Sequence, residues 1–155
     1  MIDMTIFRLD DLFSFAHELY RDDPSAEFMP ALVVFKADQT MDLIKFPDFD
    51  ERRFDVLHKL GYGYALEQET VLAAVFMAEF WIRDALQPNV GKQEAFIMLA
   101  KTTDQQYEIR IATIDRSNGN LILLNDGPDS VEDNLLAEFF TGYKLGQQTF
   151  SAHVN

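Results

Sequence analysis

The stretch TVLAAVFMAEFWIRD, residues 70–84, decides which fold this chain can adopt. As a helix, it would be apolar nearly all round and would need complete burial. Its alanines and methionine favour a helix. As a strand, its side chains would alternate between two faces, one apolar throughout and the other turning polar towards its end. We interpret the stretch as a strand. The apolar face would hold Leu72, Ala74, Phe76, Ala78, Phe80 and Ile82, and the other face Val71, Ala73, Val75, Met77, Glu79, Trp81 and Arg83.

The segments on either side of this strand also have strand character. Downstream, EAFIMLAK and YEIRIATI flank the turn-rich TTDQQ, and LILL follows RSNGN, whose Asn118-Gly119 pair is a strong hairpin signal. Upstream, ALVVFKADQTMDLIKF is two β-rich runs around the short polar link ADQT, which predicts a hairpin ending at Pro47.

Three segments have helical spacing of apolar residues. The first predicts a helix over about residues 7–21, closed by Pro24. The second begins near Asp50 as N-cap and either stops at Leu60 or runs on to Leu66, because Gly61 and Gly63 weaken the pattern. The third begins at a sequence that resembles a capping box, Asp129 with Glu132, and is predicted to stop at Gly142.

The resulting order of elements is α-β-β-α-β-β-β-β-α. Short connections throughout this order predict an α+β fold, with a mostly antiparallel sheet of five to six strands and helices packed on it. The chain has 155 residues, which fits one domain, and no repeat or linker divides it. We therefore predict a single domain over residues 1–142 and a loosely ordered C-terminal tail over residues 143–155.

The composition restricts the partners of the chain. A net charge of −13 argues against direct binding to nucleic acid or to anionic membrane surfaces, since both require clustered lysine and arginine. The same acidity is compatible with a protein that mimics DNA. The absence of cysteine excludes disulfides, iron–sulfur clusters and thiol catalysis. Fourteen phenylalanines predict an aromatic-rich core or a contact between subunits.

The N-terminal sequence MIDMTIFRLDD lacks the basic-then-apolar order of a secretory signal. The longest uninterrupted apolar run, residues 71–78, is much shorter than the roughly 20 residues that span a membrane. The expected location is therefore the cytoplasm.

Familiar catalytic and cofactor motifs do not occur. Neither His17 nor His58 has a metal-ligand partner one helical turn away, and a GxSxG nucleophile motif is absent. GYGYAL lacks the third glycine and the Lys-Ser/Thr pair of phosphate-binding loops. The acidic clusters do not match a calcium loop. No cofactor and no metal are predicted.

One group of polar residues remains as a candidate site. Glu79, Trp81 and Arg83 would share one face of the sheet, and antiparallel neighbours could place Glu94 and Arg110 beside them. Such a group could be a set of cross-strand ion pairs. It could also line a ligand pocket, where a partly buried carboxylate becomes a candidate acid or base. We keep both interpretations.

The same region carries a resemblance to a family. AVFMAEFW, a loop and KQEAFIML together resemble an uncharacterised family of small bacterial and phage-associated proteins with a Glu-x-Trp strand followed by a Glu-Ala strand. The matching residues are Glu79, Trp81, Pro88, Lys92, Glu94 and Ala95, within about 25 residues of the chain. In the family an arginine nearer the glutamate is expected where this chain has Lys92. The resemblance supports two strands and implies no activity.

The function that the sequence favours is that of a non-enzymatic interaction or structural protein that self-associates. A homodimer is expected because it is the commonest soluble oligomer. The alternatives are a small-ligand binder or enzyme that uses Glu79, Trp81, Arg83, Glu94 and Arg110, and an acidic inhibitor that mimics DNA.

Overall fold

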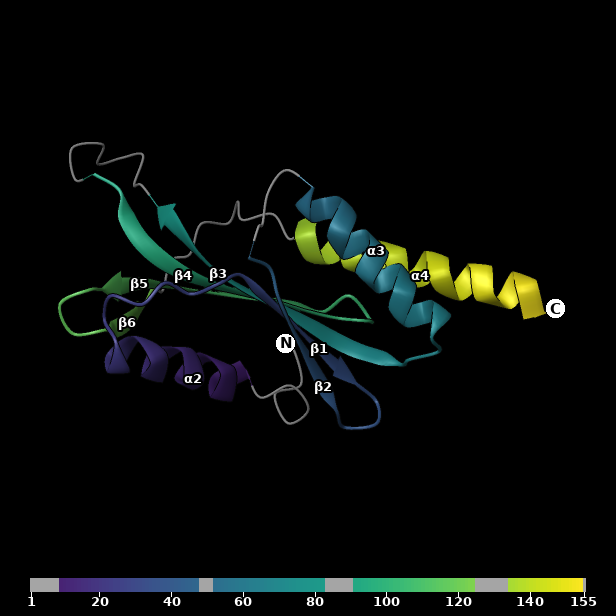
Figure 1. Cartoon of the computed structure of the whole chain (residues 1–155), viewed down its shortest axis with the longest axis horizontal. Coiled ribbons are helices and arrows are strands. Elements are labelled where there is room, and N and C mark those ends of the chain that lie inside the picture. Colours follow the sequence, from purple (N-terminus) through teal and green to yellow (C-terminus); the bar gives the residue numbers. More distant parts are fainter. Residues whose placement is uncertain (1–8, 48–51, 83–90, 125–133, 155) are drawn as a thin grey trace.

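The computed structural model describes residues 9–47, 52–82, 91–124 and 134–154. It shows a single α+β domain with the predicted order of elements (Figure 1). The helices and strands, in chain order, are α2 (Leu9–Asp22), β1 (Ala31–Lys36), β2 (Met41–Lys45), α3 (Arg53–Leu66), β3 (Val71–Ile82), β4 (Gln93–Thr102), β5 (Tyr107–Asp115), β6 (Asn120–Leu123) and α4 (Asn134–Val154).

The six strands form one antiparallel sheet in the order β2-β1-β3-β4-β5-β6. Both predicted hairpins, β1–β2 and β5–β6, are present. Gly119 in the β5–β6 turn has a φ of 77°, a conformation that favours glycine. A side chain there would also collide with the backbone of Tyr20, so this turn lies directly against the end of α2.

Helices cover the two faces of the sheet. On one face, α3 and α4 lie side by side and enclose a core that contains Leu57, Leu136 and Phe139. On the other face, α2 lies over the β6 end of the sheet and contributes Ala16 and Tyr20 to a second core. Because helices stand on both faces, the central strands are buried on both sides.

This arrangement confirms the strand interpretation of the decisive stretch. β3 pairs with β1 and β4, and every residue from Ala73 to Ala78 is buried. A strand buried on both faces needs no polar alternation along its centre, which is why the pattern alone resembled a buried helix.

The second helix takes the longer of its two predicted courses and runs through both glycines to Leu66. Gly61 is needed there, since a Cβ atom would lie 1.9 Å from the carbonyl oxygen of Phe139 on α4. Gly61 therefore has a packing cause, whereas a Cβ atom on Gly63 would meet nothing within 4 Å. The predicted N-cap at Asp50 lies outside the described residues.

The prediction for the C-terminus is wrong. α4 does not stop at Gly142, and residues 143–154 are helical rather than a loosely ordered tail. A Cβ atom on Gly142 would lie 2.0 Å from the carbonyl oxygen of His58, so this glycine allows α4 to approach α3 closely. Tyr143, one residue later, is buried and its hydroxyl donates to the carbonyl of Glu69 at 3.0 Å. The predicted capping box, Asp129 with Glu132, lies outside the described residues.

Within the described part of the chain, no helix has the length and apolar character needed to span a membrane.

Candidate functional site

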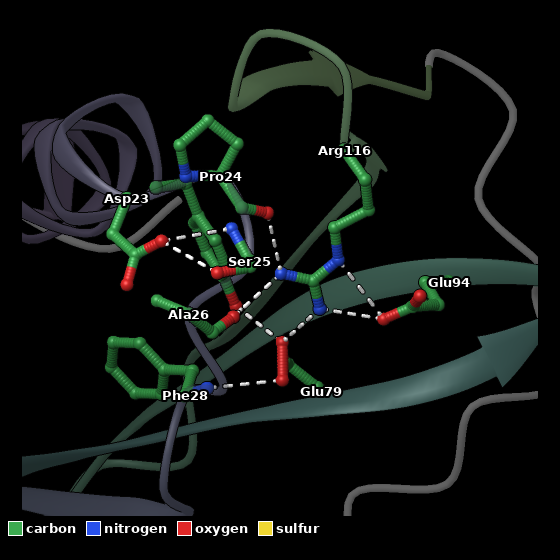
Figure 2. Close-up of polar contacts among 9 residues, drawn as sticks. Asp23, Pro24, Ser25, Ala26, Phe28, Glu79, Glu94 and Arg116 are labelled. Carbon is green, nitrogen blue, oxygen red and sulfur yellow. Dashed lines mark hydrogen bonds and ion pairs between the residues drawn. The ribbon is translucent and has the colours of Figure 1, made fainter.

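Arg116 lies at the centre of the polar cluster on the α2 face of the sheet. It follows β5, at the start of the turn into β6. Its Nε and Nη2 donate to Glu94 Oε2 at 3.2 and 2.6 Å, and Nη2 also donates to Glu79 Oε2 at 3.0 Å. Figure 2 shows the guanidinium group lying between the two carboxylates. One cation therefore joins the ends of two neighbouring strands, β3 and β4.

The remaining nitrogen of Arg116 holds the segment that follows α2. Nη1 donates to the carbonyl oxygens of Pro24 and Ala26 at 3.1 and 2.5 Å (Figure 2). This segment is shaped locally, because Asp23 Oδ1 accepts from the backbone N–H and the hydroxyl of Ser25. All three nitrogens of the guanidinium group are thus engaged by the protein itself.

Glu79 is the most enclosed carboxylate of the group, with its side chain 18% exposed. Its Oε1 accepts from the backbone N–H of Phe28 at 3.0 Å, and its Oε2 accepts from the Tyr20 hydroxyl at 2.9 Å as well as from Arg116. The guanidinium carbon of Arg116 lies 5.5 Å from the centre of the Tyr20 ring, a cation–π distance. We call Arg116, Glu79, Glu94 and Tyr20, with the two carbonyl groups, the Arg116 cluster.

Two groups of the cluster have shifted protonation equilibria. Burial of Tyr20, together with its hydrogen bond to the Glu79 carboxylate, raises the pKa of the phenol well above its usual range. The hydrogen bond to Glu94 raises the pKa of Arg116 further. Both groups are protonated at neutral pH without these shifts, and the raised pKa values move them further from deprotonation, which suits a structural contact better than proton transfer.

The structure brings some of the five predicted site residues together and places others elsewhere. Glu79 and Glu94 are brought together, and Trp81 lies directly opposite Glu94 across the β3–β4 pair. Arg110 is not beside them. It lies opposite Met98, four residues from Glu94, which corresponds to about 13 Å along the strand.

Arg110 instead pairs with Asp10 at the start of α2 at 2.5 Å and with Glu108 at 3.7 Å. The prediction that it joins Glu79 and Glu94 is therefore wrong. Arg83 lies outside the described residues.

Arg116 is the central residue that the sequence interpretation missed, and a signal for it existed. In an antiparallel pair, the end of one strand lies beside the start of the next. Glu94 stands at the start of β4, so a basic neighbour from β5 had to come from the end of that strand, where Arg116 follows directly. Tyr20 and Phe28 carry no comparable signal, since only the packing of α2 and of the segment that follows it places them there.

A shallow, open depression of about 470 Å³ lies beside the cluster. Trp81, which is 62% exposed, forms part of its lining together with Lys92, Thr113 and Ile122. Glu94 and Arg116 also line it, but their charged groups are bound to each other, and Glu79 does not reach it. The cluster therefore borders the depression with two charged groups that are already bound to each other.

The histidines on the helices have structural contacts. His17 Nε2 accepts from the backbone N–H of Leu121 at 3.3 Å, and His58 Nδ1 lies 3.4 Å from Glu138. Among the residues that the structure describes, no three acidic or histidine side chains gather in a way that could hold a metal ion.

Fold and cluster together define a single-domain α+β protein with a six-stranded antiparallel sheet, whose strand ends are joined by an arginine–carboxylate network. Compared with protein-family models, curated proteins and solved structures, the chain matches none of them. The resemblance to small bacterial and phage-associated proteins therefore stays a prediction.

Proposed function

We propose that this chain is a non-enzymatic interaction protein that self-associates, with two copies meeting along the outer edge of β2. The observation that carries the proposal is the character of this edge. β2 is the first strand of the sheet and pairs only with β1 among the described strands. Its side chains Met41 and Leu43 are 59% and 55% exposed. An exposed apolar edge strand is a template for pairing with another strand.

The backbone of β2 is oriented for such pairing. Phe46 donates to the carbonyl of Pro30 at 2.8 Å, and Lys36 donates to the carbonyl of Thr40 at 3.0 Å. Hydrogen-bonded and non-hydrogen-bonded positions alternate along an antiparallel pair. The N–H and C=O groups of Met41, Leu43 and Lys45 therefore point away from β1, towards a second copy.

Charge also favours this edge. Each copy has a net charge of −13, so two copies repel one another wherever their acidic surfaces come together. Residues 31–46, which form the β1–β2 hairpin, contain two lysines and two aspartates and so have no net charge. Pairing about a two-fold axis through Leu43 would join the two sheets and place the exposed side chains of the two β2 strands together.

Light scattering on a size-exclusion column tests the proposal. Wild type should have twice the mass of one chain, which is 17.8 kDa. Leu43→Pro removes an outward N–H and should give the mass of one chain. Leu123→Pro is the matched control. Leu123 is also an exposed leucine, and its backbone N–H points away from β5 on the opposite edge strand. A monomeric wild type at high micromolar concentration, or a monomer produced by Leu123→Pro alone, would overturn the proposal.

The other two functions have less support. A ligand site built on Glu79, Glu94 and Trp81 would need free polar groups, whereas both carboxylates are bound to Arg116. DNA mimicry needs negative charge spaced along one elongated face, and no described feature favours it. Both stay predictions.

A further inference from the structure

An apolar groove of about 660 Å³ lies between α2 and the β1–β2 side of the sheet. Because α2 covers the β6 end of its face, part of the sheet surface near β2 remains open. The groove collects Phe15, Leu19, Met29, Met41 and Leu43, which are five of the twelve large apolar side chains that are exposed in the described part of the chain. We call it the α2–β2 groove.

The lining of the α2–β2 groove suits a peptide with large apolar side chains. Phe15 and Leu19 form one wall from α2, and Val33 lies in the floor. Met29, Met41 and Met77 are flexible and polarisable side chains that adapt to different apolar partners. The volume is in the range of about 300–1,000 Å³ that is usual for binding pockets.

The charge at the groove selects the kind of peptide. Asp11, Phe15, Glu18, Leu19 and Asp22 are all exposed, and their spacing places them on one stripe along α2. Acidic and apolar side chains therefore alternate along this exposed stripe of α2, of which Asp11, Phe15 and Leu19 line the groove and Glu18 and Asp22 lie beside it. Glu27 adds a further acidic group to the lining, and Lys45 is its one basic residue.

We propose that the α2–β2 groove binds a segment of a partner protein whose apolar side chains are flanked by lysine or arginine. The apolar side chains of the segment would fill the groove, and its basic groups would face the acidic stripe of α2. A second copy of this chain is a poorer occupant of the acidic wall, because it carries the same negative charge. The inference deepens the proposed function by naming its partner, but it does not require the dimer.

Fluorescence anisotropy with designed peptides tests the inference. The probe is a labelled amphipathic peptide of leucine and lysine; its controls are the same peptide with glutamate for lysine, and with serine for leucine. The Leu/Lys peptide should bind, and its affinity should fall as salt is raised, because salt screens the acidic stripe. Binding of the Leu/Glu peptide with equal affinity would overturn the inference.

Matched variants locate the site. Leu19→Ser removes an exposed leucine from the groove and should weaken binding about tenfold, which corresponds to the burial of one large side chain. Leu145→Ser removes a comparably exposed leucine from α4 and should leave the affinity unchanged. Equal losses in the two variants would show non-specific attraction and overturn the inference. Thermal melts followed by circular dichroism check that both variants are folded.

The masses of the same samples separate this inference from the proposed dimer. A monomeric wild type that binds the peptide would refute self-association and support the groove, and a dimer that fails to bind would do the reverse. If Leu19→Ser dissociates the dimer, a second copy covers the groove and the inference fails. It fails also if the peptide binds only after residues 1–8 are removed, since the chain's own N-terminal segment would then be the occupant.

Discussion

Replacement of Glu79 by glutamine tests whether the Arg116 cluster stabilises the fold. The carboxylate accepts hydrogen bonds from three donors, namely the Tyr20 hydroxyl, the Phe28 N–H and Arg116. A glutamine amide has one acceptor oxygen and one NH₂ group. If the oxygen faces Arg116, the NH₂ group meets the N–H of Phe28; if it faces Phe28, the NH₂ group meets Arg116. Either orientation sets a donor against a donor.

The expected loss follows from the burial and the remaining contacts. An exposed ion pair contributes about 0–1 kcal/mol, whereas breaking a buried pair costs about 3–5 kcal/mol. The Glu79 side chain is 18% exposed, and Arg116 keeps its contact with Glu94 at 2.6 Å. The free energy of unfolding should therefore fall by about 2 kcal/mol, between these two limits.

Urea denaturation of wild type and Glu79→Gln at neutral pH measures this loss, provided that the m-values agree. Glu18→Gln, on the exposed face of α2, is the control and should change stability by less than about 0.5 kcal/mol. The double variant E79Q/E94Q should lose more than the sum of the single losses, because Arg116 would then have no carboxylate partner. Unchanged or greater stability of Glu79→Gln would refute the reasoning and point to a role for Glu79 in binding.

Four further variants test other features of the structure. Gly142→Ala should lower the free energy of unfolding by about 1–3 kcal/mol through overpacking between α3 and α4. Gly63→Ala should raise it by about 0.5–1 kcal/mol, because a Cβ atom there meets nothing within 4 Å. Urea denaturation of both variants measures these changes. Above pH 10.0, wild type should lose stability, because the raised pKa of Tyr20 keeps the folded phenol protonated while the unfolded one ionises. Tyr20→Phe should reduce that slope in melts at increasing pH. The hydrogen bonds from Ser117 lower the pKa of Asp115, so this contact stabilises the fold above pH 3.8 and the stabilisation is lost in acid. Ser117→Ala should therefore reduce the loss of stability that is measured between neutral and acidic pH.

Much of the fold could be predicted from local pattern. The strand runs, the two hairpins and their turns depend on residues that are close in the sequence, such as Asn118-Gly119. The end of α4 could not be predicted in this way. Glycine ends helices in isolation, but Gly142 lies against the carbonyl of His58 on another helix, and the close contact outweighs the local preference.

The candidate site was likewise predictable in part from local pattern and in part only from the tertiary structure. The sequence by itself determined that Glu79 and Trp81 share a face of β3, because side chains alternate with a fixed period of two along a strand, whereas the pairing of β3 with β4 set Glu94 beside Glu79. Only the tertiary structure decided which cation joins them. The register of β4 against β5 places Arg110 far along the strand, and the turn after β5 brings Arg116 between the two carboxylates. Likewise the position of α2, set by packing over many residues, encloses Glu79 on one side and leaves the α2–β2 groove open on the other. Periodicity is a property of each strand, whereas register and helix placement are properties of the whole core.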